Sequence, residues 1–208
     1  MFERFSRKYQ LTFQETLATG GDLTVSPLER IPGFEEFMAR YEGATFDHGL
    51  YRVHLREQRT RWTARAEEAF PTLKGRVSCF AYDWLGRQFA LDNARRQGGQ
   101  PLILLLEIGT GEILEIPLTF ADFHENELVD DPDAALLPGL FQDWLALKHN
   151  PPRPHECVGY KTPLFLGGAD TLDNMESTDM DVYWTLFGQM LAKVRNLPEG
   201  TPIKGFTV

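Results

Sequence analysis

The uninterrupted apolar run from Leu102 to Leu106 restricts the fold of this chain more than any other sequence feature. A strand with one face in water alternates apolar and polar residues, so a run without alternation indicates a strand covered on both faces. Gly109-Thr110-Gly111 separates this run from a second strand pattern over residues 112–116, and the two glycines favour a hairpin turn. We therefore expect a buried strand within a mainly antiparallel sheet.

Helix and strand patterns on both sides of this hairpin complete the expected fold. Residues 76–82 alternate as a strand, and a turn at 83–86 leads into another strand over 87–91. The sequence predicts an α+β protein with a mainly antiparallel central sheet covered by helices, a more helical N-terminal region and a C-terminal docking helix. The other expected elements are helices over 34–41 and 60–70, helices starting at Thr119 and Pro138, and strands over 49–55 and 156–160.

The last helix is expected to begin at about Met180. Asp179 and Asp181 lie where the positive end of a helix favours carboxylates, and residues 198–200 end the pattern. A long apolar stripe is unstable in water, so we expect this helix to dock on the core. The stripe consists of Met180, Trp184, Phe187, Leu191 and Val194.

The formal net charge of −9 is distributed unevenly along the chain. Residues 1–100 carry 15 basic and 13 acidic residues, whereas residues 101–208 carry 6 and 17. No Lys or Arg occurs between Arg96 and Lys148. A field of this sign repels nucleic acid and attracts basic partners, although a solubilising surface is the simpler explanation of a charge run. We expect no nucleic-acid binding.

Cysteine use and hydropathy indicate the compartment. Cys79 and Cys157 lie far apart, which gives neither a disulfide framework nor the paired spacing of a zinc site. The longest apolar run, residues 101–106, is far shorter than the roughly 18 to 20 residues that a membrane-spanning helix needs, and no secretory segment is visible. We therefore expect a cytoplasmic protein that does not contact a membrane.

One segment resembles the start of a metalloprotease helix. Residues 124–128 read His-Glu-Asn-Glu-Leu, so a leucine stands where the second zinc-binding histidine is needed. There is also no Gly-x-Ser-x-Gly motif, no Gly-Lys-Ser/Thr motif and no complete dinucleotide fingerprint. Cys157 lies two residues from His155, an arrangement that fits a half-buried structural cysteine better than a nucleophile. We predict no catalytic residue and no cofactor.

Two groups of carboxylates have the oxygen ligands that a divalent cation needs. One lies over residues 130–133 and the other over residues 170–173. Neither has the glycine and the terminal glutamate of a calcium loop, so loop solvation and helix capping explain them better, and we predict no metal. A metal-dependent enzyme that uses the loop from Asp170 to Asp181 remains an alternative.

Basic residues cluster around Trp62. We expect either a solvated helix face or a rim that pairs with the acidic half of the same chain, because the whole molecule is acidic. The cluster consists of Arg52, Arg56, Arg59, Arg61 and Arg65.

Two stretches resemble a known family. Residues 156–168 read Glu-Cys-Val-Gly-Tyr-Lys-Thr-Pro-Leu-Phe-Leu-Gly-Gly, and Asp-Asn at 173–174, Thr-Asp-Met-Asp-Val-Tyr-Trp at 178–184 and Gly-Gln at 188–189 follow. This string resembles the immunity proteins that neutralise DNase effectors of bacterial type VI secretion, a group with a GAD-like N-terminal region and a characteristic C-terminal domain. Residues 32–41 and the following Phe-Asp-His-Gly-Leu-Tyr-Arg at 46–52 resemble the GAD-like pattern of a helix and a Gly-Leu-aromatic strand.

The resemblance implies a GAD-like region over residues 1–98 and an acidic immunity domain over residues 99–208, or one continuous unit of both. It also implies a cytoplasmic antitoxin that binds its cognate effector toxin, a DNase, and blocks it without catalysis. A housekeeping interaction module with a different partner is a further alternative. The string itself has a structural explanation, in which glycines 159, 167 and 168 form turns and the aromatic residues pack in a core.

A DNase is generally basic where it holds the phosphate backbone, so an acidic surface can occupy that groove. We expect the contacts to come from carboxylates in turns and at helix starts, which folding needs least. Glu107 and Glu115 are poorer candidates because each lies in an expected strand. The candidate toxin-binding residues are Glu125, Glu127, Asp130, Asp131, Asp133, Asp170 and Asp173.

Overall fold

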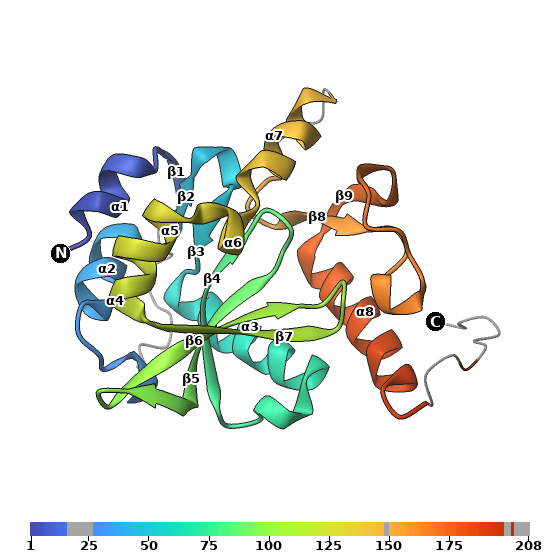
Figure 1. Cartoon of the computed structure of the whole chain (residues 1–208), viewed down its shortest axis with the longest axis horizontal. Helices are drawn as coiled ribbons and strands as arrows, with labels where there is room; N and C mark the ends of the chain where they lie inside the picture. Colours follow the sequence, from blue (N-terminus) through green and yellow to red (C-terminus); the bar gives the residue numbers. More distant parts are fainter. Residues whose placement is uncertain (16–26, 148–149, 198–200, 202–208) are drawn as a thin grey trace.

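The computed structural model describes residues 1–15, 27–147, 150–197 and 201 (Figure 1). The described strands form a seven-stranded sheet, in the order β1-β2-β3-β4-β5-β6-β7, and a separate two-stranded sheet, β8-β9. Every pairing is antiparallel, and helices pack around the sheet, so the α+β prediction is confirmed. The strands are β1 (Leu11–Gln14), β2 (Ala44–Phe46), β3 (Tyr51–Val53), β4 (Val77–Asp83), β5 (Gln88–Gln97), β6 (Gln100–Glu107), β7 (Glu112–Thr119), β8 (Glu156–Tyr160) and β9 (Met175–Asp179).

The helices lie at both ends of the chain and between the strands. The described ranges also contain the 3₁₀ turns η1 (Pro27–Glu29), η2 (Asp47–Gly49), η3 (Pro71–Leu73), η5 (Leu164–Leu166) and η6 (Leu172–Asn174). The segment η4 (Phe123–Glu127) is a π-helical turn between α4 and α5. The α-helices are α1 (Glu3–Lys8), α2 (Phe34–Tyr41), α3 (Arg56–Ala69), α4 (Phe120–Asp122), α5 (Leu128–Asp130), α6 (Pro132–Leu136), α7 (Pro138–Ala146) and α8 (Met180–Val194). No helix in these described ranges is long and apolar enough to cross a membrane.

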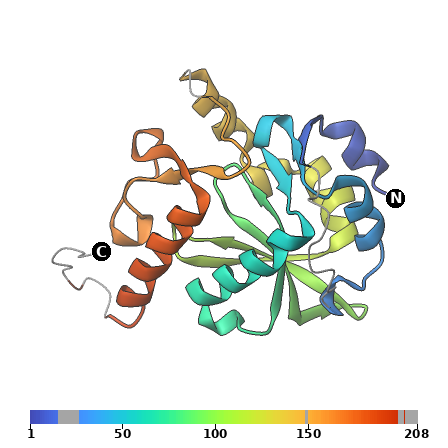
Figure 2. The same cartoon turned by 180° about the vertical axis from the view of Figure 1, so that it is seen from behind.

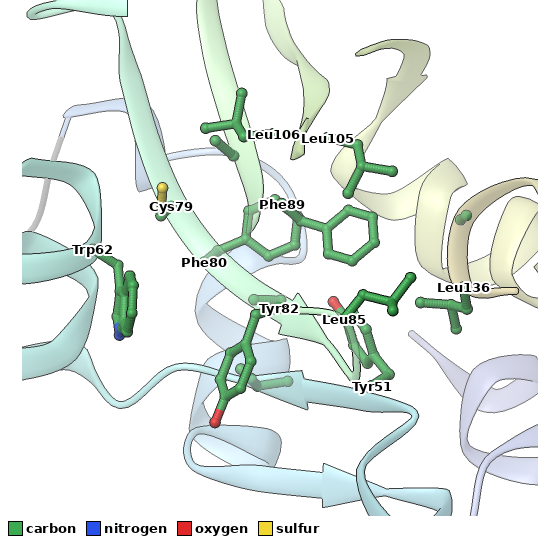
Figure 3. Close-up of a cluster of buried hydrophobic side chains, with 14 of the residues drawn as sticks. Tyr51, Trp62, Cys79, Phe80, Tyr82, Leu85, Phe89, Leu105, Leu106 and Leu136 are labelled. Carbon is green, nitrogen blue, oxygen red and sulfur yellow. The ribbon is translucent and has the colours of Figure 1, made fainter. Parts of the chain in front are cut away.

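The apolar run predicted as a covered strand is β6. It lies between β5 and β7, and its residues from Ile103 to Leu106 are all buried. On one side of β4, Phe80 packs edge-on against Phe120 of α4, with ring centroids 5.2 Å apart. On the other side lies α3 with Trp62, as Figure 3 shows. Successive side chains of a strand point to opposite faces, so the burial of four consecutive residues shows that both faces of β6 are covered, which explains its lack of polar alternation.

The turn between β4 and β5 joins the sheet to the C-terminal part of the chain. The Trp84 carbonyl accepts a hydrogen bond from the backbone N–H of Val158 in β8, at 2.8 Å. The Gly86 carbonyl accepts one from the Trp184 indole in α8, also at 2.8 Å. Gly86 has a φ of +75°, and a Cβ there would lie 2.9 Å from the Cys157 Sγ, so both conformation and space require glycine.

The C-terminal helix α8 docks on the core as predicted. Asp179 caps it by accepting a hydrogen bond from the Val182 backbone N–H at 2.9 Å. Of the predicted stripe, Met180, Trp184, Phe187 and Leu191 are buried and Val194 is partly buried. Figure 2 shows α8 beside α3, where the two helices are in contact.

Several elements differ from the sequence predictions. The first third contains three short strands where one was expected, because each obtains its hydrogen bonds from a neighbouring strand and carries little local signal. Strand β9 occupies part of a predicted loop, and it pairs with β8. Gly159 lies within β8 and not in a turn; a Cβ there would be 2.6 Å from the Tyr183 ring. Cys157 is fully buried where half-burial was expected.

The boundary expected between residues 98 and 99 falls in the turn from β5 to β6. Gln97 and Gln100 pair across this turn, and the sheet runs through it. This arrangement accommodates the alternative of one continuous unit, and the division into two regions stays a prediction.

Candidate functional site

The first candidate group lies on the helical segment that runs from α4 to α6. Thr119 caps the start of this segment as predicted: its side chain accepts a hydrogen bond from the Asp122 backbone N–H at 3.3 Å. The segment passes beside α1 (Figure 1), and Arg4 and Lys8 of that helix donate hydrogen bonds to it. Arg4 forms an ion pair with Asp130 at 2.6 Å and also donates to the Glu125 carbonyl.

The structure divides the five carboxylates of this group into engaged and exposed members. The Glu125 carboxylate accepts a hydrogen bond from the Phe5 backbone N–H at 3.3 Å, and Asp130 is paired with Arg4. Glu127 is half-buried, and its pKa is raised by burial and, to a lesser degree, by Asp131. Asp131 and Asp133 are exposed and have no ion-pair partner among the described residues.

The second candidate group lies in the loop between β8 and β9. The Asp170 carboxylate accepts a hydrogen bond from the Tyr160 hydroxyl at 2.8 Å, whereas the Asp173 side chain is exposed. Figures 1 and 2 place this loop beside α8 and the first group beside α1, toward opposite ends of the long axis. The structure therefore gathers the first five residues on one segment and keeps the other two apart from them.

The two poorer candidates have partners in the sheet. Glu115 forms an ion pair with Arg95 at 3.2 Å. Glu107 belongs to a buried cluster in which Arg87 lies 2.6 Å from Asp83 and 3.5 Å from Glu107. Burial raises the pKa of Glu107 to about 7, against the opposing effect of Arg87. Sequence reasoning missed this cluster, whose only signal is two charged residues flanking the β4–β5 turn.

The five arginines predicted as one cluster lie in different surroundings, some paired with acidic residues and some buried. Arg61 and Arg65 pair with Asp181 at 2.9 Å and 3.0 Å, so the prediction of pairing with the acidic half is confirmed for these two. Arg52 and Arg59 are buried, so the solvated-face interpretation is wrong for them. Arg59 pairs with Glu29 at 3.2 Å, and Arg52 donates to the Pro152 carbonyl.

A polar cleft of about 310 Å³ lies where α3, β4 and the start of α8 meet. Sequence reasoning did not find it, because its residues come from distant parts of the chain. Trp62 and Tyr82 give it aromatic walls, and charged side chains surround them. The lining residues are Glu15, Gln58, Arg61, Trp62, Tyr82, Pro154, His155, Asp179, Met180 and Asp181.

The buried histidine His124 and the buried cysteine Cys79 are held within the core. His124 donates from Nδ1 to the Phe120 carbonyl and accepts at Nε2 from the Tyr51 hydroxyl, each at 2.8 Å. Burial lowers the His124 pKa to about 3, so this imidazole is neutral. Burial also raises the pKa of Cys79 to about 12. Within the described ranges no three His, Cys, Asp or Glu side chains are grouped as metal ligands.

The fold and these surfaces define an α+β protein with an acidic C-terminal half whose predicted site residues are carboxylates on two separate segments. Comparison with known families shows what part of the chain is similar to. Residues 120–191 match the family described as "T6SS immunity protein Tdi1, C-terminal". The matched residues run from the start of α4 into α8 and contain the whole C-terminal string on which the resemblance rests.

The resemblance to type VI secretion immunity proteins is thereby confirmed over these residues, which are similar to the C-terminal domain of that family. The GAD-like pattern lies outside the matched residues and stays a prediction. Among solved structures, the chain is similar to the crystal structure of Atu4351 from Agrobacterium tumefaciens, with a TM-score of 0.60 and 16% identity over 91% of this chain and 89% of that one. At this identity the likeness shows the fold alone. No curated protein sequence matches the chain.

Proposed function

We propose that this chain is an immunity protein that binds a cognate type VI secretion toxin in the cytoplasm, that the toxin is a DNase, and that the chain blocks it by occlusion. The observation that carries the proposal is the family match over residues 120–191. Inhibition by occlusion needs no chemistry from the chain, so the proposed protein is not an enzyme.

The charge distribution supports a nuclease as the toxin. The net charge is −9, and the excess of carboxylates lies in residues 101–208. An enzyme that holds DNA presents basic side chains along its groove, and complementary charge speeds association with an acidic partner. Asp131 and Asp133 are the best placed carboxylates of the first group, because both are exposed and neither forms an ion pair with a described residue.

The first experiment tests inhibition itself. The chain is co-expressed with the nuclease toxin encoded beside it, and growth, co-purification and plasmid cleavage are measured. We expect restored growth, a stable complex and protected plasmid, with no hydrolase activity of the purified chain alone. A chain that neither rescues growth nor co-purifies with that toxin contradicts the proposal.

The second experiment tests the acidic surface. Asp131→Lys with Asp133→Lys reverses two unpaired charges and leaves the Arg4–Asp130 ion pair intact. Asp173→Lys with Glu176→Lys tests the second candidate group in the same way, because Asp173 belongs to that group and both carboxylates are exposed on its side of the molecule. The first variant should slow association about tenfold at low salt and flatten its salt dependence, with little change in stability.

Glu35→Lys with Glu57→Lys reverses two exposed carboxylates outside both groups, and this matched control should associate at a rate close to that of the wild type. If the variants of both groups associate like the wild type at every salt concentration, the acidic half is only a solubilising surface. If the variant of the second group slows association and that of the first does not, the contact lies at the β8–β9 side of the molecule.

A further inference from the structure

The helix α7 projects from the body of the molecule, with its C-terminal end outermost (Figures 1 and 2). Residues 137–147, the α7 arm, consist of this helix and the residue on either side of it. Phe141 and Trp144 are buried, and Phe141 packs against Trp84 with ring centroids 5.1 Å apart. The arm therefore has an inner face on the body and an outer face in solvent. The exposed residues of the helix and its outer end include Gln142, Asp143, Ala146 and Leu147.

Side chains of the β4–β5 turn hold the chain where it enters the arm. The Trp84 indole N–H donates to the Leu136 carbonyl at 2.9 Å, and Arg87 donates to the Ala135 carbonyl at 2.8 Å. The next residue, Leu137, has a φ of +51°, a left-handed conformation that residues other than glycine rarely adopt. Such a conformation persists only where the surrounding structure imposes it, so the anchors fix the direction in which the arm leaves the body.

The chain that returns from the arm is also held by the sheet. The Tyr82 hydroxyl in β4 donates to the Pro154 carbonyl at 2.6 Å, and Arg52 in β3 donates to the Pro152 carbonyl. Arg52 is 2% exposed, and its Nε and Nη1 have no hydrogen-bond partner in the described part of the chain. Burying a charge without a counterion costs stability, so a need to fix this segment explains the arginine better than a gain in folding free energy does.

The four anchoring hydrogen bonds all end on main-chain carbonyls at the base of the arm. They do not involve the exposed side chains of α7, which can therefore change without releasing the arm. A segment that is already ordered loses less conformational entropy when it binds than a free loop does. The arm is thus a preformed projection whose outer side chains are available for recognition.

The exposed face of the arm is acidic and ends in an apolar residue. No Lys or Arg occurs between Arg96 and Lys148. Asp143 is exposed and forms no ion pair with the residues that the structure describes. Leu147, at the outer end, is 56% exposed. A matching surface is concave, carries cations along its sides and offers an apolar contact at its bottom.

We propose that the α7 arm enters a concave, cation-lined groove of the partner protein, with Leu147 foremost. An enzyme that holds nucleic acid has a groove of this charge, and a projecting helix fills a groove where a flat face does not. That the partner is a nuclease toxin rests on the proposed function. That the arm is the contacting element rests on its anchors and its exposed face.

The first test changes the exposed face and keeps all four anchors. Leu147→Gln with Asp143→Lys is the arm variant, and Leu114→Gln with Glu112→Lys is the matched control on β7, where Leu114 is 41% exposed and Glu112 is also exposed. Calorimetry gives the affinity for an inactivated form of the toxin encoded beside this chain, and the thermal midpoint of each free variant is measured. The arm variant should bind about tenfold more weakly or worse, the control within about twofold of the wild type, and both midpoints should stay near that of the wild type.

Three results overturn the proposal. The first is an arm variant that binds like the wild type. The second is equal weakening by the arm variant and the control, because net charge alone would then explain the effect. The third is weakening by the control alone, which places the contact on β7.

The second test loosens one anchor and leaves the exposed face unchanged. Tyr82→Phe removes the hydroxyl that holds the Pro154 carbonyl. Tyr41→Phe is the matched control, since the Tyr41 hydroxyl is buried and has no hydrogen-bond partner among the described residues. Backbone amides of α7 should exchange hydrogen about tenfold faster in Tyr82→Phe, and the toxin should bind about threefold more weakly, while the control matches the wild type in both. Wild-type exchange and affinity in Tyr82→Phe would contradict a preformed arm.

The wild-type chain separates this inference from the proposed function. If it protects cells and the arm variant binds the toxin equally well, the function stands and the arm is refuted. If the wild type neither binds the toxin nor protects, the function is refuted, and photo-crosslinking in cells from position 147, with position 114 as the control, decides the arm. A crosslinked protein that, once purified, binds the wild type about tenfold more tightly than the arm variant supports the arm. No crosslink from position 147 overturns it.

Discussion

Replacing Trp184 by alanine should destabilise the whole protein. The indole is fully buried in α8, with ring centroids 6.2 Å from Trp62 and 6.3 Å from Phe70, and its N–H donates to the Gly86 carbonyl at 2.8 Å. Truncating a buried Trp or Phe to alanine typically costs about 3 to 5 kcal/mol, because apolar contact is lost and a cavity remains. The variant also leaves the Gly86 carbonyl without its donor, which places the expected cost toward the upper end.

The expected loss is a large share of the free energy of unfolding, which is about 5 to 15 kcal/mol for most proteins. For a chain of this length each kcal/mol shifts the thermal midpoint by about 2 to 4 °C, so the midpoint should fall by roughly 6 to 20 °C. Urea unfolding followed by circular dichroism gives the free energy, and calorimetry gives the midpoint. Trp184→Phe keeps a ring but loses the N–H, and it should cost less than the alanine variant.

Val182→Ala is the matched control on the same helix. This side chain is 50% exposed, and surface substitutions usually change stability by less than about 0.5 kcal/mol. If Trp184→Ala unfolds at the same midpoint as Val182→Ala while losing the toxin, α8 is a recognition helix and its packing on the core contributes no stability.

Three further results are expected. Because burial raises the folded pKa of Glu107 to about 7, the folded state keeps a proton that the unfolded state releases, so the wild type should lose stability as pH rises from about 4.5 to about 7. In urea unfolding at pH 5 and pH 8, Glu107→Gln should reduce this loss by roughly 1 to 3 kcal/mol, and an unchanged dependence of stability on pH would refute the raised pKa. Arg4 and Asp130 form an exposed ion pair, so a double-mutant cycle of urea unfolding should give no coupling beyond the error of the measurement. Cys79 and Cys157 are buried and their thiol pKa values are raised, so an aromatic disulfide reagent, followed by absorbance, should label them only after unfolding. Labelling of the native protein would show that the core opens.

The sequence determined the elements whose signals are local. The run from Leu102 to Leu106 identified the covered strand, and the glycines around Thr110 identified its hairpin. The stripe beginning at Met180 and the cap at Thr119 marked two helix starts. Each of these signals is read within about a dozen residues, because helix caps and apolar periodicity act over one or a few turns of chain. The family resemblance of the C-terminal string was also present in the sequence alone.

Only the tertiary structure decided which charged residues are exposed. Five neighbouring carboxylates look alike in the sequence, but Asp130 is paired with Arg4 while Asp131 and Asp133 have no ion-pair partner in the described structure. Likewise, Arg59 is buried among partners while Arg61 reaches solvent, although both lie on one helix. Exposure depends on which distant segment packs against a side chain, and composition does not report that.

The short strands and the cleft also depend on tertiary structure. Strands β1 to β3 span three or four residues each. β2 and β3 pair locally, but β1 needs β2 and β3 needs β4, and each of these two pairings joins segments that are far apart in the sequence. The cleft brings together Glu15, Trp62, Tyr82 and Asp179, which lie on four separate segments of the chain. Local patterns fix the elements because their interactions span a few residues, whereas sites are fixed by long-range packing, which brings together residues with no sequence relation to one another.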